Sequence, residues 1–251
     1  MIEYRANLVG IILLEFISLG ETFVLWIAIF RNESEINGFT LQSTLLYYLL
    51  VPLIGFITKV NISKDRSLEI KNGSFSNHLV KPYNLWLTSF IETCARKIQT
   101  LILIVPLYLI VLTVFSLTIT SLNFNVRNII LTVVFSTGGF LLNFIIDIFI
   151  SWLAFWVTDI WSFEHFKYIL FAIFGGLSFP FDLLSENIRC IFEILPFKYF
   201  YYIPISYFLG KRNINLLAND TISILIWSLI FILLAFISWK QGLKKYESYG
   251  N

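Results

Sequence analysis

Six long apolar stretches constrain this 251-residue chain more than any other feature of its sequence. Each stretch meets or approaches the roughly 20 mostly apolar residues that a membrane-spanning α-helix needs. Charged residues make up 14% of the chain, whereas soluble domains carry about 25%. We therefore expect an all-α integral membrane protein, and we exclude soluble enzymes, nucleic-acid-binding proteins and disulfide scaffolds. A single transmembrane domain over residues 1–251 is predicted, with spans at residues 8–30, 41–58, 98–120, 129–157, 166–181 and 221–239.

The distribution of Lys and Arg indicates how the spans are oriented. Residues 59–97 hold seven basic side chains, whereas the segment between the third and fourth spans holds only Arg127. Because cytoplasmic loops carry the excess of Lys and Arg, we place residues 59–97 and both chain termini in the cytoplasm, with the spans in the plasma membrane. Lys211 and Arg212 lie on the opposite side under this arrangement and favour a seven-span alternative. A seventh span would move the Lys-containing tail outside, so six spans are preferred.

Two segments outside the spans have a structure of their own. In the inner segment, residues 59–97, the pattern predicts amphipathic helices at residues 67–71 and 85–98, with turn residues at 72–74 between them. Such helices could dock on a soluble partner or lie on the lipid surface, and composition alone does not separate these options. The outer segment, residues 181–210, is mostly apolar but is interrupted by charges and prolines. We expect re-entrant or interfacial helices there, because isolated charges are costly within a spanning segment.

Three carboxylates lie deep within the predicted spans: Glu15, Glu21 and Asp147. Because no Lys or Arg lies well inside any span, we expect these carboxylates to have no counter-ion in this chain. Asp147 also belongs to a stripe of small and polar residues spaced four apart on one helix face. That stripe predicts either a helix–helix contact or a wall of a substrate path. Its other members are Gly139, Asn143 and Ser151.

Sequence motifs for catalysis, metal binding or nucleotide binding are not found. His78 and His165 lack metal-ligand spacing with Cys or carboxylates. No G-x-x-x-x-G-K-[ST] run is present, so the chain is expected to bind no ATP through a P-loop of its own. Three acidic residues in the inner segment, Asp65, Glu69 and Glu92, are interpreted as surface charges. We expect no cofactor to be bound by this chain.

Three blocks of sequence resemble the type-2 ATP-binding-cassette (ABC) permeases, in the branch of short six-span permeases encoded separately from their ATPase. The first block is Glu3-Tyr4-Arg5-Ala6-Asn7 followed by Trp26. The second, residues 70–82, is similar to the family pattern I-x-x-G-x-L-x-x-x-L-L-x-P. The third extends over residues 143–211 and includes Gly175-Gly176 and Leu195-Pro196-Phe197. Family members usually carry an amphipathic helix before the first block, whereas this sequence starts two residues before Glu3.

The resemblance implies the membrane subunit of an ATP-driven exporter. ABC ATPase subunits would bind ATP and Mg, and a second permease, identical or homologous, would complete the transporter in the bilayer. Spans one, two and five would line the dimer axis and the pathway. The coupling residues that contact the ATPase would be Arg66, Leu68, Glu69, Ile70, Gly73, Leu79 and Pro82. The outer gate would include Gly175, Gly176, Pro180, Asp182 and Pro196.

A second function class is compatible with the same residues. Three deep carboxylates without counter-ions are typical of a self-contained carrier driven by protons. In that case Glu15, Glu21 and Asp147 would take up and release protons, and no ATPase would be needed. The two hypotheses differ most at Asp147, which is a packing residue in one and a proton carrier in the other.

Overall fold

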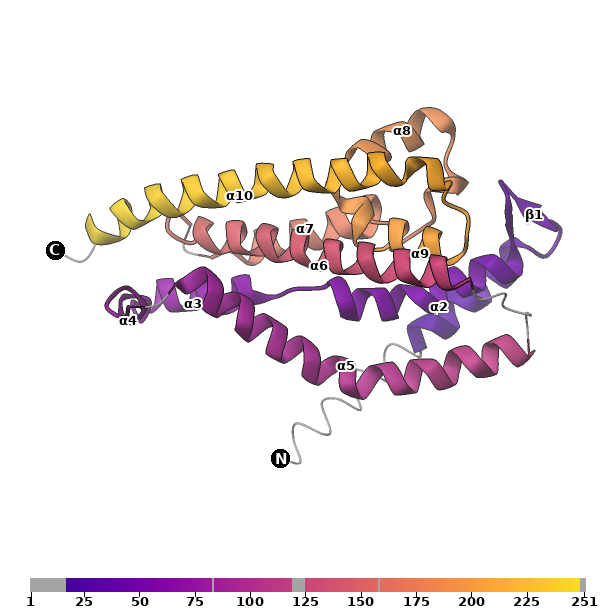
Figure 1. Cartoon of the computed structure of the whole chain (residues 1–251), viewed down its shortest axis with the longest axis horizontal. Helices are drawn as coiled ribbons and strands as arrows, with labels where there is room; N and C mark the ends of the chain where they lie inside the picture. Colours follow the sequence, from indigo (N-terminus) through magenta and orange to yellow (C-terminus); the bar gives the residue numbers. More distant parts are fainter. Residues whose placement is uncertain (1–16, 83, 119–124, 158, 249–251) are drawn as a thin grey trace.

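The computed structural model describes residues 17–82, 84–118, 125–157 and 159–248, which form an elongated bundle of helices (Figure 1). Four helical segments are long and apolar enough to cross a membrane, and a shorter apolar helix covers Ile17–Ile29. These long apolar helices confirm the predicted all-α membrane protein. The number of spans and their orientation stay predictions. The four segments are Leu41–Lys71, Leu85–Phe115, Val126–Leu153 and Ile214–Tyr246.

Helix α6 (Val126–Leu153) lies at the centre of the bundle, with α10 (Leu217–Ser248) along one side of it and α2 (Leu41–Thr58) along another (Figure 1). The side chain of Asn125 caps its first turn by accepting a hydrogen bond from the backbone N–H of Arg127, at 3.0 Å. Contacts with α2, α3, α9 and α10 bury much of α6. The central helix is thus the element on which the others are placed.

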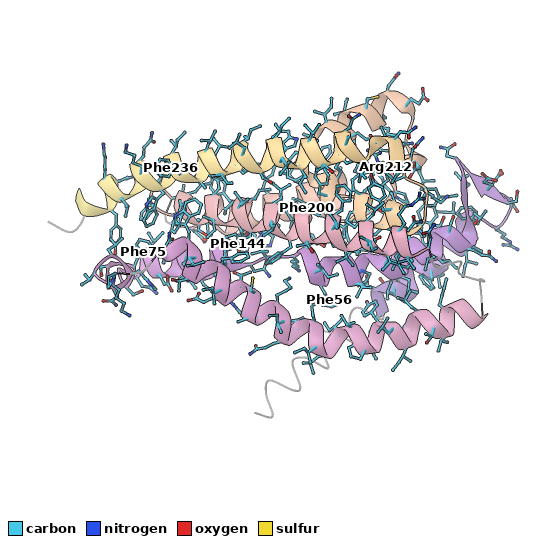
Figure 2. The ribbon with its side chains drawn as sticks, viewed as in Figure 1. Phe56, Phe75, Phe144, Phe200, Arg212 and Phe236 are labelled. Carbon is cyan, nitrogen blue, oxygen red and sulfur yellow. The ribbon has the colours of Figure 1, made fainter. Side chains whose placement is uncertain are left out.

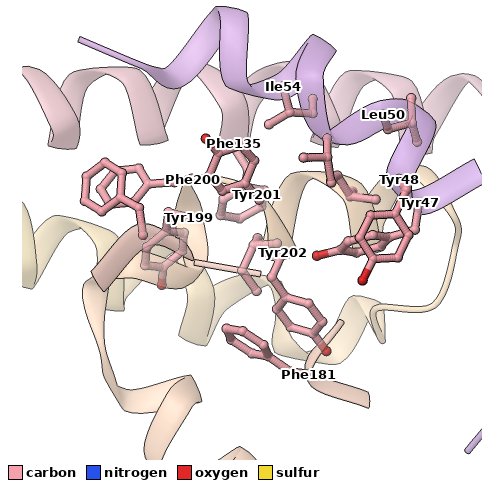
Figure 3. Packing of buried hydrophobic residues seen from close by; sticks show 14 of the residues in the cluster. Tyr47, Tyr48, Leu50, Ile54, Phe135, Phe181, Tyr199, Phe200, Tyr201 and Tyr202 are labelled. Carbon is pink, nitrogen blue, oxygen red and sulfur yellow. The ribbon is translucent and has the colours of Figure 1, made fainter. Parts of the chain in front are cut away.

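The buried aromatic residues fall into two clusters. The larger joins α2, α6 and α9 and contains Tyr47, Phe135 and Phe200 (Figure 3). The smaller lies around Phe75, where the end of α6 meets the C-terminal half of α10 (Figure 2). Phe56 and Phe236, also labelled in Figure 2, are not among the buried residues of either cluster. Each cluster holds one end of the bundle together.

The segment after α2 differs from its prediction at two places. Helix α3 covers Ile62–Lys71, so it begins five residues before the predicted helix at residue 67. Helix α5 covers Leu85–Thr118 without a break, whereas the sequence predicts an amphipathic helix ending at residue 98 and a separate span. No Gly or Pro stands near residue 98 to end a helix, so the amphipathic and apolar parts form one continuous helix. A short helix, α4 (Ser76–Leu79), lies between α3 and α5.

The predicted fifth span, residues 166–181, is displaced in the structure. Helix α7 covers Trp161–Phe174 and ends at Gly175, so only 14 residues are helical. The chain then forms a series of short helices before α10, in the region where re-entrant or interfacial helices are predicted. They are η1 (Phe181–Leu183), α8 (Glu186–Ile194), η2 (Pro196–Tyr199), α9 (Tyr202–Phe208) and η3 (Ile214–Leu216).

The structure contains one small sheet that the sequence analysis does not predict. Strands β1 (Glu35–Ile36) and β2 (Phe39–Thr40) form an antiparallel hairpin before α2. Its two turn residues, Asn37 and Gly38, have φ angles of 47° and 83°. A two-residue hairpin turn of this kind requires positive φ at both positions, and Asn-Gly is the dipeptide that supplies it most readily. The Asn-Gly pair is therefore the signal in the sequence that indicates this hairpin.

The two ends of the bundle are called the α4 end and the β1 end, after elements that form them. The α4 end contains α3, α4, the start of α5 and the C-terminal part of α10 (Figure 1). The β1 end contains the β1–β2 hairpin, α8 and the start of α10 (Figure 1). Residues 1–16, which include the predicted carboxylate Glu15, lie outside the described part of the chain.

Candidate functional site

Asp147 of α6 is fully buried and binds the junction between α2 and α3. Its carboxylate accepts a hydrogen bond from the backbone N–H of Ser63, at 2.9 Å, and forms an ion pair with Lys167 of α7. The Lys167 ammonium also donates to the backbone carbonyl of Val60, at 3.2 Å. The prediction that Asp147 has no counter-ion in this chain is therefore wrong. Lys167 is the second residue of the predicted fifth span, and its long side chain reaches the carboxylate from there.

The other members of the stripe that contains Asp147 also have partners within this chain. The Asn143 amide donates to the backbone carbonyl of Thr58 at 2.8 Å, just where α2 ends. A Cβ atom added at Gly139 would lie 2.3 Å from the backbone carbonyl oxygen of Tyr199, so only glycine allows this close approach. The Ser151 hydroxyl donates to the carbonyl of Asp147 in its own helix, at 2.8 Å. The stripe thus packs against other parts of the same chain.

A buried arginine ties α3 to the start of α5. Arg66 is 2% exposed, and its guanidinium donates to Ser89 at 3.1 Å, to Glu69 at 2.8 Å and to Glu92 at 2.5 Å. A second ion pair, between Asp65 and Arg96, links the same two helices. The acidic residues interpreted as surface charges are partly exposed, but each one belongs to an ion pair. Together these pairs hold α3 at a fixed position against α5.

The turn after α3 is anchored to the bundle through Phe75. This ring is fully buried and packs against Trp152 at the end of α6 and against Trp239 and Tyr246 of α10. The Tyr246 hydroxyl also donates to the backbone carbonyl of Gly73, at 3.0 Å. Gly73 has a φ of +74°. The turn therefore uses a conformation that residues with a Cβ atom adopt only at a cost.

The predicted coupling residues separate into two groups. Arg66 and Ile70 are buried, at 2% and 7% exposure, so they act within the chain and not at its surface. Leu68 and Leu79 are 47% and 42% exposed, and the neighbouring Val80 is 86% exposed. The sequence pattern does not separate these groups. The remaining members of the predicted set are Glu69, which is partly buried, and Gly73 and Pro82, which are exposed.

The predicted outer-gate glycines lie where α7 ends and contact α2. Gly176 has a φ of +88°, and its carbonyl accepts a hydrogen bond from the Tyr47 hydroxyl at 2.6 Å (Figure 3 shows the position of Tyr47). A Cβ atom at this position would lie 2.6 Å from the Tyr47 hydroxyl oxygen. The backbone N–H of Tyr202 donates to the carbonyl of Gly175, at 2.9 Å. Gly175, Gly176, Pro180 and Pro196 are all buried, so these residues join α2, α7 and α9.

Beside these glycines, the β1 end contains a network of buried charges. Arg212, labelled in Figure 2, donates to both carboxylate oxygens of Asp220, at 2.9 and 2.7 Å, and to Glu193 at 3.1 Å. Arg189 then joins Glu193 at 2.9 Å to Asp182 at 3.0 Å. The sequence analysis places Arg212 on the outer side of the membrane, where Lys and Arg are less common than on the cytoplasmic side. In the structure it is 8% exposed and paired, so it is not a free positive charge.

The network alters the ionisation of its own members. Burial raises the pKa of the Glu193 carboxyl, but the hydrogen bonds and charges of Arg212 and Arg189 outweigh burial and hold the pKa below its usual range. Burial lowers the pKa of the Arg212 guanidinium, but its contacts with Asp220 and Glu193 outweigh burial and raise the pKa. The ion pairs of Glu193 with Arg212 and Arg189 are therefore formed at neutral pH.

A cavity of about 760 Å³ opens between four helical segments. Helix Ile17–Ile29 contributes Trp26, α2 contributes Tyr48 and Phe56, α5 contributes Lys97, and α7 contributes Tyr168. Its volume lies within the range of about 300–1,000 Å³ that is usual for small-molecule sites. Helix Ile17–Ile29, α2 and α7 correspond to spans one, two and five of the sequence prediction. Glu21, the second predicted deep carboxylate, is an exposed residue of the first of these helices and does not line the cavity.

Similarity to a known protein family agrees with this geometry. A family model described as ABC-2 family transporter protein matches residues 16–250. No curated protein and no solved structure matches the chain. The family match covers nearly the whole sequence and confirms the resemblance to type-2 ABC permeases. The chain therefore belongs to the ABC-2 transporter family and is a multi-pass membrane permease component of an ABC transporter.

Proposed function

We propose that this chain is the permease subunit of an ATP-driven exporter, coupled to separate ATPase subunits and paired with a second, identical or homologous permease. ATP and Mg bind only in the ATPase. In this proposal the chain crosses the plasma membrane six times, and both termini lie in the cytoplasm. The α4 end then faces the ATPase, and the β1 end faces outward.

The observation that carries this proposal is the exposed apolar surface at the α4 end. Leu68 of α3 and, further along the chain, Leu79 and Val80 are exposed. Helix α3 is held in a fixed position. Arg66 fixes α3 against α5, and Phe75 fixes the following turn against α6 and α10. A rigid segment with exposed apolar side chains is suited to docking, because little conformational entropy is lost when a partner binds.

The contacts of Ser63 support a route from the docking segment into the spans. Ser63 lies in the first turn of α3, and its backbone N–H is bound by Asp147 of α6. Its hydroxyl donates to Glu164 of α7, at 2.9 Å. One residue of α3 is therefore joined to two further helices. A displacement of α3 by the ATPase would act on α6 and α7 together, as expected when packed elements move as rigid units.

Helix α7 extends this route to the β1 end. It runs from the neighbourhood of Ser63 to Gly175 and Gly176, which are bonded to α9 and α2. A movement of α7 would thus change the contacts of Tyr47 with the chain after α7. In this mechanism the predicted gate responds to docking through the short helix α7.

One of the three carboxylates on which the proton-driven alternative depends has a counter-ion in this chain. That alternative requires deep carboxylates without counter-ions, but Asp147 is paired with Lys167 and bonded to Ser63. These two contacts give Asp147 a structural role between α6, α7 and the start of α3. We therefore retain the ATP-driven mechanism.

The test is a reconstitution of the permease with its cognate ATPase, carrying Gly73→Pro at the α4 end. Gly73 has a φ of +74°, which the pyrrolidine ring of proline cannot adopt because it locks φ in the negative range. We expect ATP hydrolysis to lose its response to the permease, while membrane insertion stays normal. Gly38→Pro is the matched control, because Gly38 is also a turn glycine with positive φ and open space around it, but lies at the β1 end. Equal responses from both variants would contradict the docking assignment.

A further inference from the structure

The large cavity has two chemically different parts. Away from the α4 end the walls are mainly apolar and aromatic side chains and carry no charge. Leu25, Trp26 and Val51 are among them, and the small hydroxyl residues Ser18 and Thr22 lie between them. Toward the α4 end it reaches Lys59, Asn61 and Lys97. Residues Tyr48 and Lys59, at the two ends of the α2 wall, are separated by about three helical turns. An elongated ligand with one polar end would match this division.

A smaller cavity of about 240 Å³ adjoins the polar part. It shares Lys59, Asn61, Lys97 and Thr100 with the large one. Its other walls include Thr93 and Arg96. Asp and Glu are absent from the described residues that line the two cavities. The polar part therefore offers ammonium, amide and hydroxyl groups that suit an anion.

The two lysines are not neutralised by the surrounding protein. Arg96 pairs with Asp65, but the ion pairs among the described residues include neither Lys59 nor Lys97. The Lys97 ammonium donates to the backbone carbonyls of Phe56, at 2.7 Å, and Lys59. An ammonium has three donors, so one donor of Lys97 stays available. The carbonyls at the end of α2 thus hold Lys97 in position without cancelling its charge.

We propose that the joined cavities bind an amphiphile with an apolar body and an anionic head group, the head group lying between Lys59 and Lys97. This proposal rests on the proposed transport function, because it names the chemical class that the transporter carries. The uncharged, mainly apolar walls favour an apolar body over a ligand that is polar throughout, since polar groups without partners are costly there. The two unpaired ammonium groups disfavour a cationic head group, because like charges repel.

The test uses the full-length chain in nanodiscs of zwitterionic phosphatidylcholine and two fluorescent probes. Dansyl-labelled undecanoic acid is the anionic probe, and dansyl-labelled undecylamine is its cationic counterpart of equal length. Fluorescence is measured after subtraction of empty nanodiscs of the same lipid. We expect the anionic probe to bind about tenfold more tightly, as one charge-assisted hydrogen bond implies. Equal affinity for both probes would overturn the proposal.

Substitutions locate the site. Lys59→Gln is expected to weaken binding of the anionic probe about tenfold, whereas Lys64→Gln, at an exposed lysine that lines neither cavity, leaves it unchanged. Lys97→Gln should weaken it similarly, and Lys97→Arg, which keeps the charge and the donors, should retain most of the affinity. Ala172→Phe inserts a ring into the apolar part and should reduce binding of the probe. An unchanged affinity in Lys59→Gln and Ala172→Phe would contradict the site.

The source of the amphiphile is tested by replacing phosphatidylcholine with phosphatidylglycerol. Loss of probe binding identifies a bilayer phospholipid as the occupant, and unchanged binding identifies an amphiphile that enters from water. Both results fit an anionic amphiphile.

If the probe shows no charge preference while Gly73→Pro still uncouples the ATPase, only the substrate class is wrong. If Gly73→Pro has no effect while probe binding follows Lys59, the ATPase-coupled function is wrong.

Discussion

Two ion pairs, one at each end of the bundle, differ strongly in their exposure to solvent. At the β1 end, Arg212 and Asp220 are buried and paired, and Asp220 also accepts hydrogen bonds from the hydroxyls of Tyr199 and Tyr207. At the α4 end, Asp65 and Arg96 pair in the open, with side chains 45% and 54% exposed. The Arg212–Asp220 pair of the β1 end is therefore buried, whereas the Asp65–Arg96 pair of the α4 end is exposed, as are Leu68, Leu79 and Val80 near it. This difference agrees with the docking proposed for the α4 end.

The largest expected effect comes from breaking the buried network at the β1 end. Arg212→Met removes the closest cation from buried Asp220 and leaves only Lys198, at 3.5 Å, so we expect a loss toward the lower end of about 3–5 kcal/mol of unfolding free energy. Arg96→Met at the α4 end removes an exposed pair and is expected to cost less than about 1 kcal/mol. Denaturant unfolding in detergent micelles measures both. Similar losses in the two variants would remove the contrast between the ends.

The second-largest expected effect comes from changing Asp147, which joins α6 to α3 and α7. Asp147→Asn leaves the Lys167 ammonium buried and unpaired, and we expect a loss of about 3 kcal/mol in unfolding free energy. Adding Lys167→Met should restore a substantial part of that loss, because it removes the one charge that Asp147→Asn leaves without a counter-ion. Unfolding of the single and double variants in micelles provides the measurement. Lack of restoration would indicate that the ion pair is not the interaction that Asp147 supplies.

Two glycines with positive φ test how tightly each end is packed. Gly176→Ala places a Cβ atom 2.6 Å from the Tyr47 hydroxyl oxygen, in addition to straining the backbone. We expect this variant to lose about 2 kcal/mol of unfolding free energy or more. Gly73→Ala at the α4 end meets nothing within 4 Å, and backbone strain alone should cost about 1 kcal/mol. Thermal unfolding compares the two, and a larger loss for Gly73→Ala would reverse the expected order.

The smallest effect is the response to acid. Because the pKa of Glu193 is held below its usual range, its ion pairs stabilise the fold above that range, and the stabilisation is lost as the pH falls through the lowered pKa. The melting temperature of the wild type should decrease when the pH falls from neutral to below 4.5, the ordinary pKa of the group. Glu193→Gln should show a smaller decrease over this range. Identical acid responses would exclude Glu193 as a contributor.

Apolar stretches predict the long helices well, because length and hydropathy are local properties. Helix α2 covers the same residues, 41–58, as the second predicted span. The prediction is less accurate for α7, where Gly175 ends the helix and the apolar residues that follow it form bends and a 3-10 turn. Composition does not show where such a stretch stops being helical.

The candidate site depends more on contacts between distant residues. Lys167 and Asp147 are 20 residues apart, and only the tertiary fold brings the long Lys167 side chain of α7 to the carboxylate on α6. The family block places Arg66 on the docking surface, yet its contacts with Ser89 and Glu92 bury it. Sequence patterns identify which residues carry charge, but the partner of each charge is set by the tertiary fold.

The most direct measurement of the central claim is the affinity of the ATPase for the permease. Leu68 of α3 and Ile188 of α8 are exposed apolar residues, 47% and 46%, on short helices of opposite ends. We predict that Leu68→Asp weakens binding of the cognate ATPase to the nanodisc-embedded permease by about tenfold or more, as loss of a central apolar contact does. Ile188→Asp should leave the affinity unchanged. Unchanged binding in Leu68→Asp, or weaker binding only in Ile188→Asp, would contradict docking at the α4 end.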